Sequence, residues 1–364
     1  MKKQIKYITL SLAAFLIFLC IATFCAGQSD EEQTYYNNPD IISNRQQREQ
    51  ADKAESGIEF YKDTKIIFAP VEKAQIILTA KDDYINSQTA FDRRIRLNKE
   101  EPVSEKEYLD FLSEQVLSWN ESEKVRIEVI IKNLAYRIKK YDLNLPPEIM
   151  LIKTTGKEEG SAAYCRGNAV VLPLNLLNQQ GQALDTLIVH ELFHIYTKNN
   201  LDKREALYGV INFKKCGKAE LPRRLLDIEI TNPDVPTERY CIELQHEGGS
   251  IKVIPMLTLP DFDVKKGRAF FRYLRLRLVE VEKINDEYKY KRNDSGEPVV
   301  YDTKELPDYP KKVGENTGYL IHPEEILADN FAMMVMGRQP VKSKWVIDKM
   351  QSMLETKSQK GVGL

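Results

Sequence analysis

The sequence predicts a helix-rich α+β fold with one small sheet and a cleft between two helices. Apolar residues recur every three or four positions along residues 104–117 and 121–141, as on one face of a helix. A short apolar run at residues 149–154 indicates a strand. Residues 184–197 and 323–337 have helical spacing again, and we expect these two helices to border the cleft.

The length and composition are those of an ordinary globular protein. At 364 residues, the chain is long enough for one large domain or two small ones. Apolar residues make up 42% and charged residues 29%, and the formal net charge is −1. Because there is no long basic run and no basic patch interleaved with aromatic residues, the sequence argues against nucleic-acid binding.

The N-terminus has the pattern of an export signal. Three lysines precede an uncharged apolar run at residues 8–24, and polar chain follows. Residues 1–27 are therefore expected to be a signal peptide that is cleaved after Gly27. Two alternatives stay open: an uncleaved membrane anchor, or a lipoprotein modified at Cys25. In all three, the rest of the chain is exported to the cell envelope or secreted, with or without membrane attachment.

The remaining chain divides by composition. Residues 28–57 are polar and lack apolar residues to bury, so we expect a tether. Residues 58–350 are expected to form the folded domain, with a long insertion at about residues 200–310. Residues 351–364 are expected to be a polar tail.

Local signals place the first elements. Ser104 and Glu107 have the S-x-x-E form of a capping box at the start of a helix. The helix at residues 121–141 is followed by a Pro-Pro pair that would end it. After the strand at residues 149–154, residues 165–168 are predicted to form the turn of a hairpin.

The second half of the domain carries fewer signals. Residues 240–244 and 251–256 are expected to pair as strands across the loop between them. Residues 270–290 have apolar positions at helical spacing, which predicts a long charged helix. Three cysteines follow the signal region, at positions 165, 216 and 241. They are expected either to include one disulfide, Cys216–Cys241, or to be three buried free thiols.

The helix at residues 184–197 contains the pattern H-E-x-x-H. His190 and His194 lie one turn apart on one face of this helix, so both imidazoles can bind a single Zn²⁺. Glu191 follows the first histidine, where its carboxylate can act as a base on water. The alternative is an amphipathic helix that carries two partly exposed histidines and a surface glutamate.

This motif resembles that of the HExxH zincin metallopeptidases. The branch with a third histidine shortly after the motif is excluded, because Thr197 and Asn200 occupy the positions it needs. The gluzincin branch takes its third ligand from E-x-x-x-D on a later helix, and Glu325 and Asp329 have that spacing. The resemblance therefore implies Glu325 as the third zinc ligand and Asp329 as the group that orients a ligand histidine.

Other residues compete for these roles. Glu324, Glu205, His246 and His322 are rivals for the third ligand, and Glu325 could instead be an acid that favours a helix N-terminus. Gluzincins often add a Tyr or His that stabilises the oxyanion, and the candidates here are Tyr319, His322 and Tyr309. Zincins also place a sheet edge beside the active-site helix for the substrate backbone. Residues 161–164 are the candidate edge, with an ordinary hairpin as the alternative.

The resemblance implies a zinc-dependent metallopeptidase that hydrolyses a peptide or protein substrate outside the cytoplasm. Its zinc would be held by His190, His194 and Glu325, and Glu191 would be the base. One alternative is an exported lipoprotein or binding protein with an inactive or structural zinc site. Another keeps the metal but changes the bond, for example to an amide in cell-wall peptide.

Overall fold

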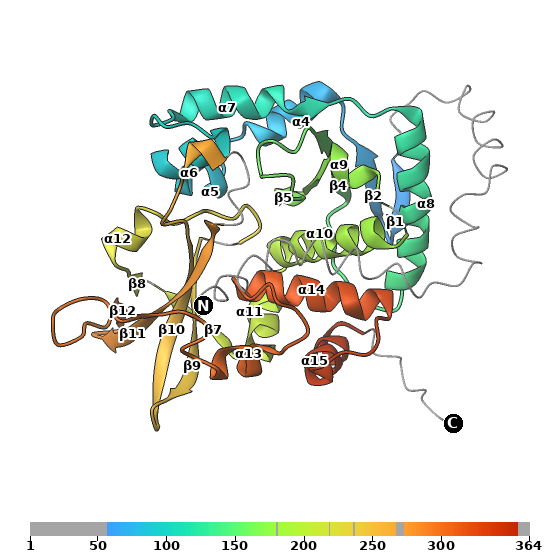
Figure 1. The fold of residues 1–364 in the computed structure, drawn as a ribbon. Helices are drawn as coiled ribbons and strands as arrows, with labels where there is room; N and C mark the ends of the chain where they lie inside the picture. Colours follow the sequence, from blue (N-terminus) through green and yellow to red (C-terminus); the bar gives the residue numbers. More distant parts are fainter. Residues whose placement is uncertain (1–56, 180, 218, 236, 267–272, 356–364) are drawn as a thin grey trace, which may run out of the picture.

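The computed structural model describes residues 57–179, 181–217, 219–235, 237–266 and 273–355 (Figure 1). Within these ranges the chain is an α+β protein, as predicted, but it has two mixed sheets where one was expected. The predicted export signal and nearly all of the predicted tether lie outside the described residues. Among the described residues, no helix is both long enough and apolar enough to cross a membrane.

The first sheet has the strand order β1-β2-β4-β6-β5, with β3 paired to β4. Its two central strands, β4 and β6, run parallel to each other and are buried on both faces, which explains their continuous apolar sequences. Its edge strand β5 is antiparallel to β6. The strands are β1 (Ile58–Tyr61), β2 (Thr64–Phe68), β3 (Val116–Leu117), β4 (Glu148–Thr154), β5 (Tyr164–Arg166) and β6 (Ala169–Pro173).

Helices cover both faces of this sheet. Neighbouring residues of a strand point to opposite faces, so adjacent residues of β4 contact different sets of helices. Leu151 of β4 packs in the same core as α8, α10 and α14, whereas Ile152 packs with α4, α5 and α7. The helices on the Ile152 side are α4 (Val71–Leu78), α5 (Asp83–Ser87), α6 (Ala90–Leu97) and α7 (Glu105–Glu114). Those on or near the Leu151 side are α8 (Glu121–Ile138), α9 (Leu174–Leu177), α10 (Ala183–Asn199), α11 (Leu201–Val210), α14 (Pro323–Met336) and α15 (Lys344–Leu354).

The helix ends follow local capping chemistry. Ser104 precedes α7, and its hydroxyl accepts a hydrogen bond from the backbone N–H of Glu107 at 3.2 Å, as the S-x-x-E pattern predicts. A reciprocal capping box between Asn120 and Glu123 starts α8, which ends at Ile138, before the predicted limit. The predicted tail at residues 351–364 begins inside α15, because the helix continues to bury apolar side chains up to Leu354.

The second sheet is formed by the predicted insertion. Its strand order is β7-β9-β10-β11-β12-β8, with β13 paired to β11. The predicted pairing of residues 240–244 with 251–256 is confirmed by β9 and β10. The strands are β7 (Phe213–Gly217), β8 (Ala219–Glu220), β9 (Arg239–His246), β10 (Gly249–Thr258), β11 (Arg275–Ile284), β12 (Glu287–Tyr290) and β13 (Val300–Tyr301). Short helices flank it: α12 (Arg223–Leu226), η2 (Val264–Lys266) and α13 (Asp308–Val313).

The predicted long helix at residues 270–290 is wrong for the part that the structure describes. Residues 275–290 form the antiparallel hairpin of β11 and β12 instead. Asn285 and Asp286 make its turn with φ of 48° and 65°, a left-handed conformation that these two residue types tolerate. The same segment alternates polar and apolar residues before and after the adjacent pair Leu278–Val279, and it contains three β-branched residues, so a strand also fits it.

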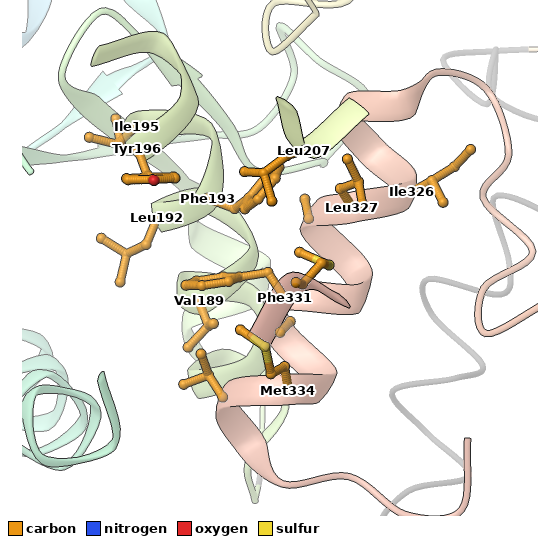
Figure 2. Close-up of a cluster of buried hydrophobic side chains, with 14 of the residues drawn as sticks. Val189, Leu192, Phe193, Ile195, Tyr196, Leu207, Ile326, Leu327, Phe331 and Met334 are labelled. Carbon is orange, nitrogen blue, oxygen red and sulfur yellow. The ribbon is translucent and has the colours of Figure 1, made fainter. Parts of the chain in front are cut away.

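Apolar packing joins the two helices that carry the predicted site. Figure 2 shows Val189 and Phe193 of α10 facing Leu327, Phe331 and Met334 of α14. The rings of Phe193 and Phe331 lie 5.5 Å apart between centroids. This contact fixes the spacing of the two helices, and therefore of the polar side chains beside it.

The three cysteines that follow the signal region are all free and buried. Cys216 and Cys241 lie on the paired strands β7 and β9, where a hydrogen bond from the Cys216 thiol lowers the pKa of Cys241 to about 7. The expected alternative of three buried thiols is therefore the one found.

Candidate metal centre

The H-E-x-x-H residues lie on α10, in the middle of the buried layer. His190 and His194 point the same way, with ring centroids 4.8 Å apart, because residues four apart share a helix face. His194 is fully buried, and the side chain of His190 retains 14% exposure. Next to these rings, Val189 and Phe193 of α10 also pack against α14, and α10 contacts strands of the first sheet, which holds the two rings in place.

The start of α14 brings the carboxylates to this face. His322 is the N-cap residue, and its Nδ1 accepts a hydrogen bond from the backbone N–H of Glu324 at 3.1 Å. Pro323 takes the first helical position, where a proline is tolerated, and Gly337 ends the helix with φ of 70°. Glu325 and Asp329, four residues apart, then project toward α10.

The ligand atoms of three residues converge between the two helices. Oε2 of Glu325 lies 3.2 Å from Nε2 of His190 and 3.8 Å from Nε2 of His194. One ligand atom from each residue lies within 4.8 Å of the other two. Two histidines and one carboxylate are the protein ligands of many catalytic zinc sites, and they leave one coordination position open.

Each histidine is held from behind by a carboxylate. Nδ1 of His190 donates to Asp329 at 2.9 Å, which is the contact that the E-x-x-x-D resemblance implies. Nδ1 of His194 donates to Glu324 at 2.8 Å. A carboxylate at Nδ1 fixes the ring and leaves the Nε2 lone pair for a metal. Thr317 donates to Asp329, and Thr197 and Tyr208 both donate to Glu324.

The donor set fits a divalent cation. Nε2 of His194 is buried and has no hydrogen-bond partner among the described residues, which is costly unless a cation occupies the space in front of it. Burial alone would lower the pKa of His190, but hydrogen bonds to Asp329 and Glu325 raise it well above 6.5. Against the same burial, the charge of Asp234 and the hydrogen bond to Glu324 raise the pKa of His194 to about 9. The surrounding carboxylates thus favour positive charge here, which a metal supplies when it displaces the protons.

The predicted base, Glu191, is 2% exposed. The Cys165 thiol of β5 donates to its Oε2 at 3.2 Å. Burial, with a further contribution from the charge of Asp234, raises the pKa of Glu191 to about 7, while the two histidines oppose the shift. A carboxyl group with a pKa near neutrality is suited to take up and release a proton.

The three residues predicted as candidates to stabilise the oxyanion lie in different surroundings. Tyr319 lies near the centre, where burial and the negative charge of Glu325 raise its pKa well above 10. His322 serves as the helix cap and is not part of the three-residue group, and burial keeps its pKa well below 6.5. Tyr309 donates to the backbone carbonyl of Leu320 at 2.7 Å and packs in the core.

The rivals for the third ligand are placed elsewhere or have another contact. Glu205 accepts a hydrogen bond from Tyr240 at 2.6 Å. The ring of His246 packs against Tyr301 in the second sheet, with centroids 5.0 Å apart. Neither belongs to the group that converges with His190, whereas Glu324 reaches the back of His194.

Sequence reasoning missed two contributors to the centre, Asn232 and Asp234. Asn232 donates from Nδ2 to Oε1 of Glu325 at 2.6 Å. Oδ1 of Asp234 accepts from the backbone N–H of Cys165 at 2.8 Å, at the sheet edge. The prolines and polar residues around Asn232 indicate a turn, but nothing in the sequence indicates that this turn reaches α14. Of the predicted edge segment, residues 161–164, only Tyr164 belongs to β5.

A cavity of about 480 Å³ lies beside the centre. Lys198, His322 and Glu324 line it on the side of the centre, together with the turn at residues 231–235. The three converging residues, His190, His194 and Glu325, are not part of its lining.

Comparison with known proteins adds no relative. No protein-family model, no curated protein and no solved structure matches the chain. The function of the centre therefore has to follow from its own residues and geometry.

Proposed function

We propose that this chain is a zinc-dependent metallopeptidase with a zincin-like site in a cleft between α10 and α14. The observation that carries the proposal is the convergence of His190, His194 and Glu325, with Nε2 of His194 buried and without a hydrogen-bond partner in the described part of the chain. Both imidazoles are held at Nδ1 by carboxylates, which is how zinc-binding histidines are usually oriented. The N-terminal sequence supports a site of action outside the cytoplasm, in the envelope or in the medium.

The residues of the site divide the chemistry. When bound, Zn²⁺ supplies Lewis acidity, which lowers the pKa of water and polarises the scissile carbonyl. Glu191 takes a proton from the attacking water and passes it to the leaving amine.

Tyr319 is the first candidate to stabilise the oxyanion. Its raised pKa keeps the phenol protonated at neutral pH, as a hydrogen-bond donor must be. His322 is the second candidate. Its Nδ1 already accepts the N–H of Glu324, so only the N–H at Nε2 is left to donate.

One observation favours a second function. Glu191 is 2% exposed and accepts a hydrogen bond from the Cys165 thiol, so its carboxylate has little contact with solvent. The second candidate is therefore an exported lipoprotein or binding protein with a structural or inactive zinc site. The two candidates differ in whether water has access to the metal, which X-ray absorption of the zinc-loaded protein measures directly.

The test of the main proposal is the zinc content per chain, measured by plasma mass spectrometry on protein purified without chelators. We expect one zinc in the parent, a large loss in Glu325→Ala, and no change in the control Glu205→Ala. Zinc in all three proteins would move the third ligand away from Glu325. No zinc in the parent would reject the metal centre, and hydrolysis of a peptide library by the zinc-loaded parent separates a peptidase from a binding protein.

A further inference from the structure

The two oxygens of Glu325 have different surroundings. Oε2 faces the two imidazoles, at 3.2 Å from Nε2 of His190 and 3.8 Å from Nε2 of His194. Oε1 faces away from them and accepts the side-chain amide of Asn232 at 2.6 Å. A carboxylate that is free to rotate could present either oxygen, or both, to a metal. The contact with Asn232 removes that freedom.

The amide of Asn232 is itself oriented. Its Oδ1 accepts the backbone N–H of Asp234 at 2.9 Å, in the manner of an Asx turn. Because Oδ1 is committed to a donor, the NH₂ group must be the end that points to Glu325. The side chain therefore meets the carboxylate with a donor, and a flipped amide would lose both contacts.

The N-terminal part of the turn that carries Asn232 is held by buried charged residues of α6. The backbone N–H of Thr231 donates to Oδ2 of Asp92 at 3.1 Å, and its carbonyl accepts from Arg96 at 2.5 Å. Asp92 and Arg96 pair with each other and are 0% and 1% exposed. Arg96 also donates to Glu159 at 2.8 Å. This ion-pair network does not touch the ligand atoms, so its effect on the centre passes through Thr231.

The C-terminal part of the turn is held by α10, which carries the histidines, and by β5. Lys198 of α10 donates to the backbone carbonyl of Pro233 at 3.1 Å and lies 3.5 Å from Asp234. Oδ1 of Asp234 also accepts the N–H of Cys165 on β5. The turn is thus tied to α6, α10 and β5 at the same time, which makes it a rigid support rather than a free loop.

We infer that Asn232 is a positioning residue for the metal centre: it holds Oε1 of Glu325 so that Oε2 alone faces the metal. The inference rests on the proposed zinc site. It assigns a role to the turn at residues 231–235, which lies between α12 and β9 of the second sheet. It also assigns a role to the buried Asp92–Arg96 pair, which binds Thr231 of this turn. The expected result is a Glu325 carboxylate that binds through one oxygen.

Two variants of the full chain test this role. Asn232→Ala removes the donor, and we expect the zinc affinity, measured against a competing chelator, to fall by about 10- to 100-fold, the usual effect of losing a group that orients a ligand. Asn232→Ser keeps a side-chain oxygen for the N–H of Asp234 but is too short to reach Glu325. We expect the same loss of affinity in this variant, with thermal unfolding close to that of the parent. Asn199→Ala, an exposed asparagine on α10, is the matched control and should bind zinc like the parent.

The visible absorption of the cobalt-loaded proteins gives a readout that a purely structural role would not change, because it depends on ligand geometry. We expect altered bands in both Asn232 variants and parental bands in Asn199→Ala. Parental affinity in a folded Asn232→Ser protein overturns the inference, and so does weaker binding with an unchanged cobalt spectrum. A parent that binds neither zinc nor cobalt overturns the proposed metal centre itself, and the two failures are therefore distinguishable.

Discussion

Oε1 of Glu324 lies 2.8 Å from Nδ1 of His194, while the next residue, Glu325, turns its carboxylate toward Nε2 of the same ring. Successive residues of a helix point about 100° apart, so one turn of α14 reaches both sides of one imidazole. Glu324 is 1% exposed and also accepts hydrogen bonds from Thr197 and Tyr208. A residue that the sequence offered only as a rival ligand thus supports the ligand histidine from behind.

Glu324→Gln should weaken zinc binding without removing a ligand. The amide keeps the size of the side chain but loses its charge, and its NH₂ group faces donors that now lack an acceptor. We expect the zinc affinity to fall by about 10- to 100-fold. The measurement is competition with a chelator of known affinity. Glu205→Gln makes the same chemical change on α11, beside Tyr240, and should leave the affinity as it is.

Glu324→Gln with the affinity of the parent would mean that His194 needs no partner at Nδ1. A complete loss of zinc, equal to that of Glu325→Ala, would instead make Glu324 a ligand. Both results would contradict the division of tasks between the two glutamates.

Glu191→Gln should separate zinc binding from hydrolysis. Glutamine cannot take a proton from water, but it has the same shape and does not alter the two histidines. We expect unchanged zinc content and a fall of about 10²- to 10⁴-fold in turnover of any peptide that the parent cleaves. Plasma mass spectrometry and a discontinuous peptide assay give the two values, with Glu205→Gln as the control. Turnover at the parental rate in this variant would reject Glu191 as the base.

Sequence reasoning reached the core of the centre because its signals are local. The spacing of His190 and His194 on one helix and of Glu325 and Asp329 on another needs only helical periodicity. The structure places these four side chains in contact across the α10–α14 interface. The role of Asn232 could not be deduced in this way, because it depends on a turn that approaches from the second sheet.

The second sheet shows where periodicity fails. Residues 275–284 have apolar side chains at positions that fit both a helical stripe and an alternating strand. The β-branched residues and the Asn285–Asp286 turn favour the hairpin that forms, but pairing with β10 and β13 decides it. These partner strands lie outside the segment, so its own periodicity does not show the pairing. One sheet was therefore predicted where the structure has two.

Glu158 should make the stability of the fold depend on pH. It is 0% exposed, and its Oε2 has no hydrogen-bond partner among the described residues. Burial raises the pKa of Glu158 from 4.5 to about 7, the charge of Glu159 adds to this, and a hydrogen bond with Thr154 opposes it. The folded state therefore holds a proton that the unfolded state has already released between these two values. The stabilisation is fully present below pH 4.5 and is lost as the pH rises to about 7.

By linkage, this loss amounts to about 3 kcal/mol of unfolding free energy at and above neutral pH. Glu158→Gln, which cannot ionise, should be free of it. Urea unfolding of both proteins at pH 5 and pH 8 measures the difference. Glu114→Gln, on an exposed position of α7, should keep the parental pH dependence. A Glu158→Gln protein that loses as much stability as the parent between the two pH values would contradict the assignment.

Arg96→Met should destabilise the fold and, through the turn, the metal centre. The arginine is 1% exposed and is the cation that faces both Asp92 and Glu159. Methionine fills a similar space but leaves two buried carboxylates without a counter-charge, which costs about 3–5 kcal/mol. It also removes the hydrogen bond to the carbonyl of Thr231, next to Asn232.

We therefore expect a large fall in the free energy of unfolding together with weaker zinc binding in the fraction that stays folded. Lys106→Met breaks an exposed ion pair with Asp110 on α7 and should change neither quantity. Denaturant unfolding and chelator competition on the same preparations measure both. If Arg96→Met lowered stability but bound zinc as the parent does, the buried pair would support the fold alone, and the turn would hold Asn232 in place without it.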